Sequence, residues 1–280
     1  MIDHCYYHEA DLDGKCSAAI VKYFNPDVKL IAWNYNKKFD FTEYIKKSYT
    51  VCMIDVSLPF KEMLKLRDLT SLIYIDHHKT ILDQLKGFTF NGIQDETTAA
   101  CILTWKYFSL EPVPSAVDLL GMYDVWDISD YTLYFQYAMR ALDGEPDSDI
   151  WPWLFKHPSI KDLENIIESG KMIYDYQEKQ DIMSHHSMIQ FKFRGLNVLA
   201  LNRLAGSSLI FQHHQLYTLS DILMVFGWNG KWKVSMYTTK DEIDVGEICK
   251  EFGGGGHKKA SGFFAVELPK EIHSGIFGGI

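Results

Sequence analysis

The sequence predicts an α/β protein, in which an N-terminal domain with a doubly wound, mostly parallel sheet is followed by a smaller C-terminal α/β domain. Short apolar runs alternate with helix-favouring segments in the first part of the chain. A second series of strand-like runs follows a long, charged, helical stretch. The chain has 280 residues, of which 47% are hydrophobic, and this is enough material for two cores.

Four apolar runs predict the strands of the first domain. They are Cys5–Tyr7, Val28–Trp33, Val51–Val56 and Leu72–Ile75. The helices expected around them are Ser17–Phe24, Pro59–Leu69, Thr97–Phe108 and Pro114–Met122. Ligands of such sheets bind outside the carboxyl ends of the strands, so we expect the functional side chains there.

The segment Asp143–Pro158 concentrates prolines, acidic residues and two tryptophans, which is typical of a domain boundary. A helical connection is expected over Ser159–Gln190. The second domain has strand-like runs at Asn197–Leu201, Ile222–Phe226, Trp232–Tyr237 and Phe263–Val266, and an amphipathic stretch at Val245–Phe252. We therefore predict a first domain over residues 1–150, a linker with connecting helices over 151–192, a second domain over 193–280, and a cleft between the domains.

Composition and charge narrow the class of partner. The formal net charge is −9 and the pI is about 5.6, so we expect no long nucleic acid to be gathered by counterion release. The five cysteines form no CxxC pair, which favours reduced thiols in a cytoplasmic protein. Because no apolar run approaches the length of a membrane span, we expect no membrane partner. The oligomeric state stays open, with a homodimer as one option.

The first candidate motif is Asp-Leu-Asp-Gly, directly before a predicted helix. Asp11 and Asp13 lie on either side of Leu12, and Gly14 lets the backbone turn away from both carboxylates. Taken alone, this motif is more typical of a turn that caps the helix. A calcium loop of the EF-hand type is excluded, because Lys15 and Lys22 stand where it needs oxygen ligands.

Further acidic residues and histidines follow other predicted elements. Asp76, His77 and His78 come directly after a buried strand, where three titratable groups would be costly without partners. Asp55 follows another strand and Asp124 follows a helix. Single aspartates at such places are commonly caps, but a set of carboxylates and imidazoles can hold two divalent metals. Two such metals would provide a hydroxide nucleophile and neutralise phosphoryl charge.

Near the C-terminus stand the four glycines Gly253, Gly254, Gly255 and Gly256, followed by His257. Consecutive glycines let a backbone approach a ligand closely and offer N–H groups to an anion, and the histidine can add charge. The run is not a P-loop, because Gly-Lys-Ser/Thr is missing. A flexible linker is the alternative, but a strand-like run begins only a few residues later.

In this order, the motifs resemble those of the DHH phosphoesterases. His8, Asp11, Asp13 and Gly14 resemble the first motif, Asp55 the second, Asp76-His77-His78 the third, and Asp124 in Gly-Met-Tyr-Asp the fourth. The segment Gly253–Phe263, GGGGHKKASGF, resembles the signature of the DHH-associated domain. The family includes RecJ-type exonucleases, oligoribonucleases and dinucleotide phosphodiesterases, and it is typically manganese-dependent.

The resemblance implies two divalent metal ions, most often Mn²⁺, with Asp55 bridging them. The first ion would be held by His8, Asp11 and Asp55, and the second by Asp13, Asp55, His77 and Asp124. His78 would face the substrate phosphate and Asp76 would orient a histidine, so these two are the predicted catalytic residues. The spacing of His8 varies within the family, and Asp127 could replace Asp124.

The resemblance also implies a substrate site in the second domain, formed by Gly253, Gly254, Gly255, Gly256 and His257. Tyr237 stands where the family often has an arginine; a tyrosine can stack on a base but cannot form a bidentate fork. We therefore expect hydrolysis of dinucleotides or very short oligonucleotides to mononucleotides. A RecJ-type single-strand exonuclease and a non-catalytic nucleotide-binding protein on the same scaffold are the alternatives. The sequence does not choose between RNA and DNA or between cyclic and linear substrates.

Overall fold

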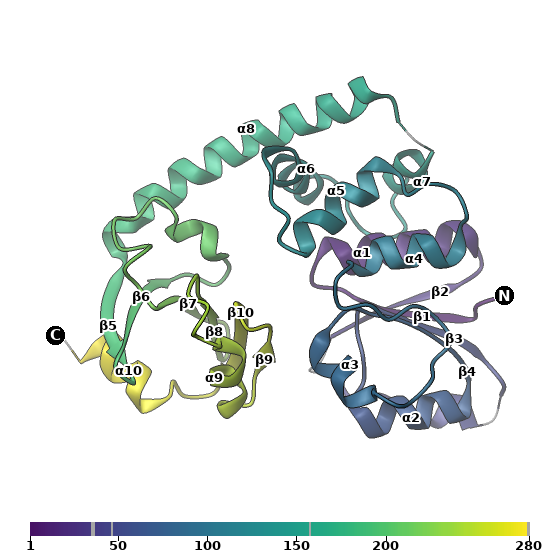
Figure 1. The fold of residues 1–280 in the computed structure, drawn as a ribbon, viewed down its shortest axis with the longest axis horizontal. Coiled ribbons are helices and arrows are strands. Elements are labelled where there is room, and N and C mark those ends of the chain that lie inside the picture. Colours follow the sequence, from purple (N-terminus) through teal and green to yellow (C-terminus); the bar gives the residue numbers. More distant parts are fainter. Residues whose placement is uncertain (35–36, 46, 157, 279–280) are drawn as a thin grey trace. The chain divides into compact units, whose positions relative to one another are not determined.

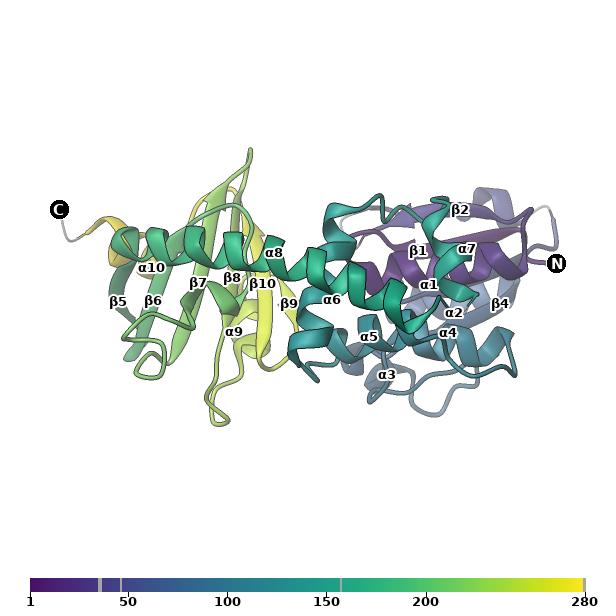
Figure 2. The ribbon, with the colours of Figure 1, turned by 90° about the horizontal axis from the view of Figure 1, so that it is seen from above.

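The computed structural model describes residues 1–34, 37–45, 47–156 and 158–278. The chain divides into two compact units, Met1–Tyr174 and Asp175–Ile280, each with its own sheet (Figures 1 and 2). This confirms the predicted fold class, with a parallel sheet in the first unit and a separate mixed sheet in the second.

The sheet of the first unit has four parallel strands in the order β2-β1-β3-β4. They are β1 (His4–His8), β2 (Lys29–Trp33), β3 (Thr50–Ile54) and β4 (Ser71–Ile75). The four predicted runs coincide with these strands, with ends that differ by up to two residues. The parallel order places the carboxyl ends of all four strands at one edge of the sheet.

Helices cover both faces of this sheet (Figure 1). One face carries α1 (Leu12–Phe24) and α4 (Ala100–Phe108), and the other carries α2 (Phe60–Leu69) and α3 (Lys79–Leu85). The helices α5 (Ser115–Asp124), α6 (Asp130–Ala141) and α7 (Ile150–Phe155) pack against α1 and α4 on the side away from the sheet (Figure 1). Alternate strand residues serve the two faces: Met53 and Tyr74 pack with α2, whereas Cys52 and Ile75 pack with α1 and α4. The sheet is therefore doubly wound.

Helix α1 begins at Leu12, five residues before the predicted start at Ser17. Asp11 is the N-cap, and its Oδ1 accepts a hydrogen bond from the backbone N–H of Gly14 at 3.0 Å. A Cβ at Gly14 would lie 2.2 Å from the carbonyl oxygen of His8. A glycine is needed because the first turn of α1 lies against the end of β1, which keeps Asp11 and Asp13 beside His8.

The segment Asp143–Pro158, predicted as a domain boundary, lies within the first unit and contains α7. Trp151 is 1% exposed and packs in the core formed by α1, α4 and α5. His157 lies outside the described residues. The long helix α8 (Ile160–Ser184) follows and continues into the second unit.

The second unit has a six-stranded sheet in the order β5-β6-β7-β8-β10-β9. The strands are β5 (Ile189–Phe193), β6 (Leu196–Asn202), β7 (Ile222–Trp228), β8 (Trp232–Tyr237), β9 (Gly255–Gly256) and β10 (Ala260–Ala265). Only the β6–β7 pair is parallel among the strands that the structure describes. Helices α9 (Val245–Glu251) and α10 (Lys270–Phe277) pack on the sheet around Phe193, Met224 and Phe226. Among the described helices of both units, none is both long and apolar enough to cross a membrane.

Candidate metal centre

The predicted metal ligands converge at the carboxyl edge of the first sheet. His8 ends β1, Asp55 follows β3 and His77 follows β4, while Asp13 lies in the first turn of α1 and Asp124 is the last residue of α5. Their ligand atoms form three overlapping groups in which all atoms lie within 4.8 Å of one another. The groups are His8 with Asp11 and Asp55, Asp13 with His77 and Asp124, and Asp55 with His77 and His78.

The two carboxylate oxygens of Asp55 face different residues: Oδ2 faces His8, and Oδ1 faces His77. Oδ2 lies 3.7 Å from Nδ1 of His8, which is itself 2.9 Å from Oδ2 of Asp11. Oδ1 lies 3.3 Å from Nε2 of His77. The same nitrogen lies 3.7 Å from Oδ2 of Asp13 and 3.4 Å from Oδ2 of Asp124. This is the geometry of a carboxylate that can bridge two ions.

The surroundings of Asp55 fit a divalent metal. Its side chain is 1% exposed, and no described residue donates a well-directed hydrogen bond to either carboxylate oxygen. A buried carboxylate in this condition is costly unless a cation compensates it. Its backbone has a φ of +55°, a strained conformation for a residue other than glycine and one that is found often at functional sites. Mixed carboxylate and imidazole ligands suit ions such as Mn²⁺ or Zn²⁺.

The crowding of carboxylates shifts their titration. Burial, together with the charges of Asp13 and Asp11, raises the pKa of Asp55 well above its usual range. Burial and the charges of Asp13 and Asp55 raise the pKa of Asp124 likewise. Burial lowers the pKa of His8, but the adjacent carboxylates of Asp11 and Asp55 outweigh it and raise this pKa to about 11. The crowded carboxylates therefore favour nearby positive charge, which divalent ions would supply.

Asp13 is held in place by the start of another helix. Its Oδ2 accepts a hydrogen bond from the backbone N–H of Ala100 at 2.9 Å, and its Oδ1 accepts one from Cys101 at 2.7 Å. Ala99, the N-cap of α4, offers no side-chain cap. Asp13 thus takes the place of the missing cap, and α4 fixes the orientation of its carboxylate.

Asp76 does not belong to any of the three groups formed by the described residues. Its Oδ1 accepts hydrogen bonds from the backbone N–H groups of His77 and His78, at 2.7 and 3.0 Å, and from Nδ1 of His78 at 2.7 Å. Its Oδ2 accepts one from the hydroxyl of Tyr74. Burial opposes ionisation of Asp76, but His78 and Tyr74 outweigh it and lower its pKa. The carboxylate therefore stays charged and holds His78.

Tyr74 is a residue that the sequence analysis missed. A signal was present, because side chains two residues apart on a strand point to the same face, and Tyr74 precedes Asp76 by two. Asp124 and Asp127, the two candidates for the fourth motif, differ in their surroundings. Asp124 lies beside His77, whereas Asp127 is exposed and is absent from the three groups that the described residues form.

Part of the glycine run in the second unit is required by the local backbone structure. The N–H groups of Gly253 and Gly254 bond to the carbonyl oxygens of Lys250 and Cys249, at 3.0 and 2.9 Å, and so end helix α9. A Cβ at Gly254 would lie 2.1 Å from the carbonyl oxygen of Gly262. Two of the four predicted anion-binding N–H groups are therefore engaged within the protein.

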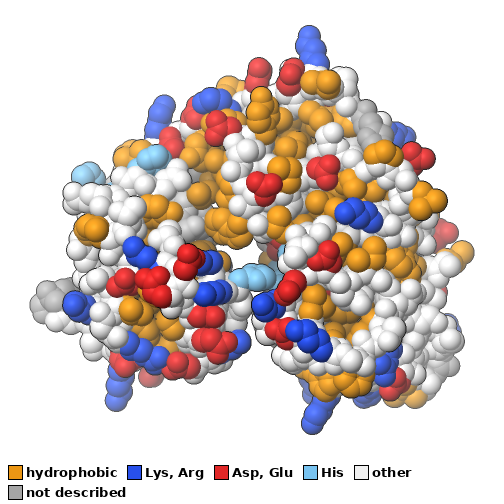
Figure 3. All heavy atoms as spheres, in the orientation of Figure 1, with side chains coloured by type: hydrophobic (Ala, Val, Ile, Leu, Met, Phe, Trp, Pro, Cys, Tyr) orange, Lys and Arg blue, Asp and Glu red, His pale blue; other side chains and the backbone are white. Residues whose placement is uncertain are grey.

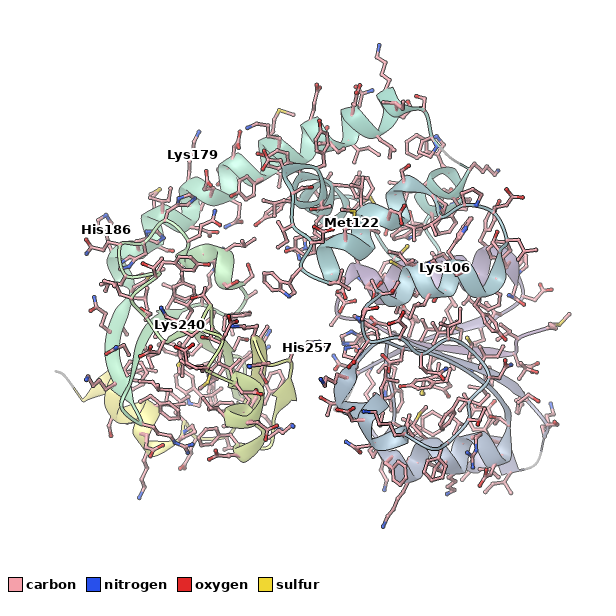
Figure 4. The ribbon with its side chains drawn as sticks, viewed as in Figure 1. Lys106, Met122, Lys179, His186, Lys240 and His257 are labelled. Atoms are coloured by element: carbon pink, nitrogen blue, oxygen red, sulfur yellow. The ribbon has the colours of Figure 1, made fainter. Side chains whose placement is uncertain are left out.

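The remaining predicted substrate residues lie on the exposed part of this loop and on β8. Gly255 and Gly256 form β9 at the edge of the sheet, and both are exposed. His257 is exposed in the turn between β9 and β10, where its N–H bonds to the carbonyl oxygen of Ala260 at 2.8 Å (Figure 4). The hydroxyl of Tyr237 donates to the carbonyl oxygen of Gly206 at 2.7 Å, and its side chain is partly exposed.

Comparison with known proteins places this geometry in context. No family model matches the sequence. The chain is 23% identical over 300 residues to an uncharacterized protein of Acanthamoeba polyphaga mimivirus, covering 93% of this chain and 67% of that protein. That protein carries no functional description to transfer.

Solved structures show the fold more clearly. The DHH domain of a protein assigned to a family of ribosomal proteins is similar with a TM-score of 0.63 at 12% identity, covering 99% of this chain and 86% of that one. A pGpG-specific phosphodiesterase from Vibrio cholerae is similar with a TM-score of 0.53 at 14% identity, covering 100% and 98%. RecJ from Thermus thermophilus, solved with Mn²⁺, is similar with a TM-score of 0.52 at 13% identity, covering 94% and 49%.

The chain therefore has the two-domain fold of the DHH proteins, and the resemblance inferred from the motifs is confirmed at the level of the fold. It spans about half the length of RecJ.

Proposed function

We propose that this chain is a divalent-metal-dependent phosphodiesterase that hydrolyses dinucleotides or very short oligonucleotides to mononucleotides. One observation carries the proposal: Asp55 is buried without a well-directed hydrogen bond from the described residues, and its two oxygens face two separate groups of ligands. A structural carboxylate would be expected to have such bonds. The DHH fold places this group at the edge of the sheet where ligands of doubly wound proteins bind.

The residues divide the chemical work. Two divalent ions would supply a nucleophile at neutral pH and neutralise phosphoryl charge. One would be held by the group of His8, Asp11 and Asp55, and the other by the group of Asp13, His77 and Asp124. Nδ1 of His78 is bonded to Asp76, so a contact of this ring with a phosphate would use Nε2. Burial lowers the pKa of His78, but the charge of Asp76 and its hydrogen bond outweigh this and raise it. The raised pKa favours the cationic imidazole, which can donate to a phosphate oxygen.

The second unit would provide the contacts that select the substrate. In this proposal Gly255, Gly256 and His257 hold a terminal phosphate, and the ring of Tyr237 stacks on a base. The proposal gives Gly253 and Gly254 a conformational role only, because their N–H groups end α9.

Short substrates are favoured over long strands by charge. The formal net charge is −9, and Figure 3 shows Lys and Arg side chains interspersed with Asp and Glu on the visible face, without a continuous basic stripe there. The similarity to a pGpG-specific phosphodiesterase, which covers 98% of that chain, supports the same choice. The similarity to RecJ is the reason to keep a single-strand exonuclease as the alternative.

A substrate panel tests the proposal. Purified protein with Mn²⁺ is incubated with linear dinucleotides including pGpG, cyclic dinucleotides, short RNA and DNA oligomers, and long single strands, and mononucleotide release is measured. Asp55→Asn is the inactive control, since it removes the bridging charge at nearly constant volume. We expect the linear dinucleotides to have the highest kcat/KM. Preference for long strands would establish the RecJ-type alternative, and tight binding without any hydrolysis would establish the non-catalytic one.

A further inference from the structure

We propose that Tyr74 is a positioning residue, which fixes the imidazole of His78 by holding the carboxylate of Asp76. The inference rests on the proposed function, because it assigns His78 to a phosphate. It extends the site by one residue that acts through Asp76.

Tyr74 lies in β4, two residues before Asp76, and its side chain is fully buried. Its ring packs against Phe90, with centroids 5.6 Å apart, and its hydroxyl donates to Oδ2 of Asp76 at 2.5 Å. Strand geometry therefore aims this hydroxyl at the carboxylate.

The two carboxylate oxygens of Asp76 have different hydrogen-bond donors. Three donors from His77 and His78 bond to Oδ1, whereas Tyr74 is the one donor to Oδ2 among the described residues. Asp76 is 0% exposed, so water does not reach Oδ2 from the surface. Without the tyrosine hydroxyl this oxygen would be a buried acceptor with no partner, and the carboxylate would gain by rotating away from His78.

The backbone around Tyr74 is fixed by the segment that follows α3. The N–H of Tyr74 bonds to the carbonyl oxygen of Asn91 at 2.7 Å, and Nε2 of Gln94 donates to the carbonyl oxygen of Tyr74 at 2.6 Å. The N–H of Asp76 bonds to the carbonyl oxygen of Ile93 at 3.2 Å. This segment thus lies along β4 and holds Tyr74 and Asp76 together.

Gly92 shows how closely this segment approaches. Its φ is +125°, and a Cβ there would lie 2.0 Å from the carbonyl oxygen of Tyr74. A glycine is required at this contact, so the support behind Tyr74 has little freedom to move. A rigid tyrosine, a carboxylate with both oxygens bonded and a histidine bonded through Nδ1 form one continuous chain of hydrogen bonds.

The experiment compares Tyr74→Phe with Tyr6→Phe. Tyr6 is a matched control, since it is a buried tyrosine of the same sheet whose hydroxyl bonds to Tyr44 at 2.6 Å, outside the site. We expect Tyr74→Phe to lower kcat for a dinucleotide about tenfold, the worth of one charge-assisted hydrogen bond, with KM changed less than about twofold. Tyr6→Phe should leave both constants unchanged. Equal losses in the two variants would overturn the positioning role.

A double-mutant cycle separates positioning from general damage. In a His78→Ala background, Tyr74→Phe should cause no further loss of kcat, because the group that it positions is gone. A further loss of about tenfold in that background would show that Tyr74 acts by another route and would overturn the proposal.

A second readout does not depend on hydrolysis. In metal-free protein labelled with ¹⁵N-histidine, long-range NMR spectra identify the proton on Nδ1 of His78, assigned by its absence in His78→Ala. We expect Tyr74→Phe to shift this resonance and Tyr6→Phe to leave it unchanged; no shift in Tyr74→Phe would overturn the inference. If Tyr74→Phe does not fold, replacing Tyr74 with 3-fluorotyrosine nearly keeps the volume and should shift the same resonance. An inactive wild type with this shift present would refute the proposed function and leave the positioning role standing.

Discussion

Oδ2 of Asp13 accepts a hydrogen bond from the backbone N–H of Ala100 at 2.9 Å, although 87 residues separate the two in the chain. The contact gives one carboxylate two tasks, as the N-terminal cap of α4 and as a member of the group with His77 and Asp124. Helix α4 packs directly on α1, so the start of α4 and the carboxylate of Asp13 on α1 are fixed together.

We predict that Asp13→Ala destabilises the metal-free protein, whereas Asp124→Ala does not. Loss of a helix cap costs about 1 kcal/mol. Removing either carboxylate relieves repulsion within the cluster, but among the described residues only Asp13 accepts hydrogen bonds from the start of α4. Urea denaturation in EDTA measures both free energies of unfolding. Equal destabilisation by the two substitutions would contradict the capping role.

Asp124→Asn and Asp127→Asn should differ sharply in hydrolysis. Oδ2 of Asp124 lies 3.4 Å from Nε2 of His77, whereas Asp127 is exposed three residues later. We expect the first substitution to lower kcat/KM by roughly a hundredfold at fixed Mn²⁺ and the second to leave it within about twofold. The reverse result would transfer the ligand role to Asp127.

Mn²⁺ should stabilise the wild type and have no effect on Asp55→Asn. The buried carboxylate has no well-directed hydrogen bond from the described residues, and its pKa is raised by burial and by Asp13 and Asp11. Removing its charge should therefore raise the melting temperature of the metal-free protein by a few degrees. Thermal unfolding with EDTA and with Mn²⁺ tests both effects. A Mn²⁺ response that persists in Asp55→Asn would show that this residue does not hold the ions.

The stability of the metal-free protein should fall as pH rises above about 6.5, and His8 should cause part of the fall. The pKa of His8 is raised to about 11 in the folded protein, against about 6.5 in the unfolded chain. Above this lower value the folded state binds the proton that the unfolded state has lost, and stability decreases with pH. Urea denaturation in EDTA from about pH 6.5 to about pH 8.5 should give a steeper slope for wild type than for His8→Gln. Parallel slopes would refute the shift.

The positions of the titratable side chains at the ends of strands were predictable, because an apolar run and the polar residues after it form a local pattern in the sequence. The structure places these residues at strand ends: His8 is the last residue of β1, and Asp55 and Asp76 directly follow β3 and β4. Two features were not predictable in the same way. The bond between Asp13 and Ala100 joins distant parts of the chain, and the positive φ of Asp55 depends on the surrounding packing.

Other misses have equally specific causes. Helix α6 (Asp130–Ala141) was not predicted, although Ser129 and Thr132 form a capping box that could have indicated it. The tryptophans and prolines of Asp143–Pro158 indicated a boundary, but Trp151 is a core residue of α7. In the glycine run, helix termination, strand pairing and close approach to a ligand all suit glycine, so the sequence could not show that Gly253 and Gly254 end α9 while Gly255 and Gly256 form β9.

The last prediction concerns His257 and the length of the substrate. In the proposed function the loop that carries His257 binds a terminal phosphate of the substrate. His257→Ala should then lower kcat/KM for a dinucleotide about tenfold, the worth of one charge-assisted contact. Hydrolysis of bis-p-nitrophenyl phosphate, which has no terminal phosphate, should stay nearly unchanged.

His186→Ala is the matched control, because His186 is also an exposed histidine of the second unit but lies in the turn after α8 (Figure 4). We expect it to leave both substrates unaffected. A dinucleotide without its 5′-phosphate should lose the same factor in the wild type and lose nothing more in His257→Ala, since the contact is then missing from either side. If His257→Ala weakens both substrates equally, the loop acts on the metal centre or on folding, and phosphate recognition must come from other residues.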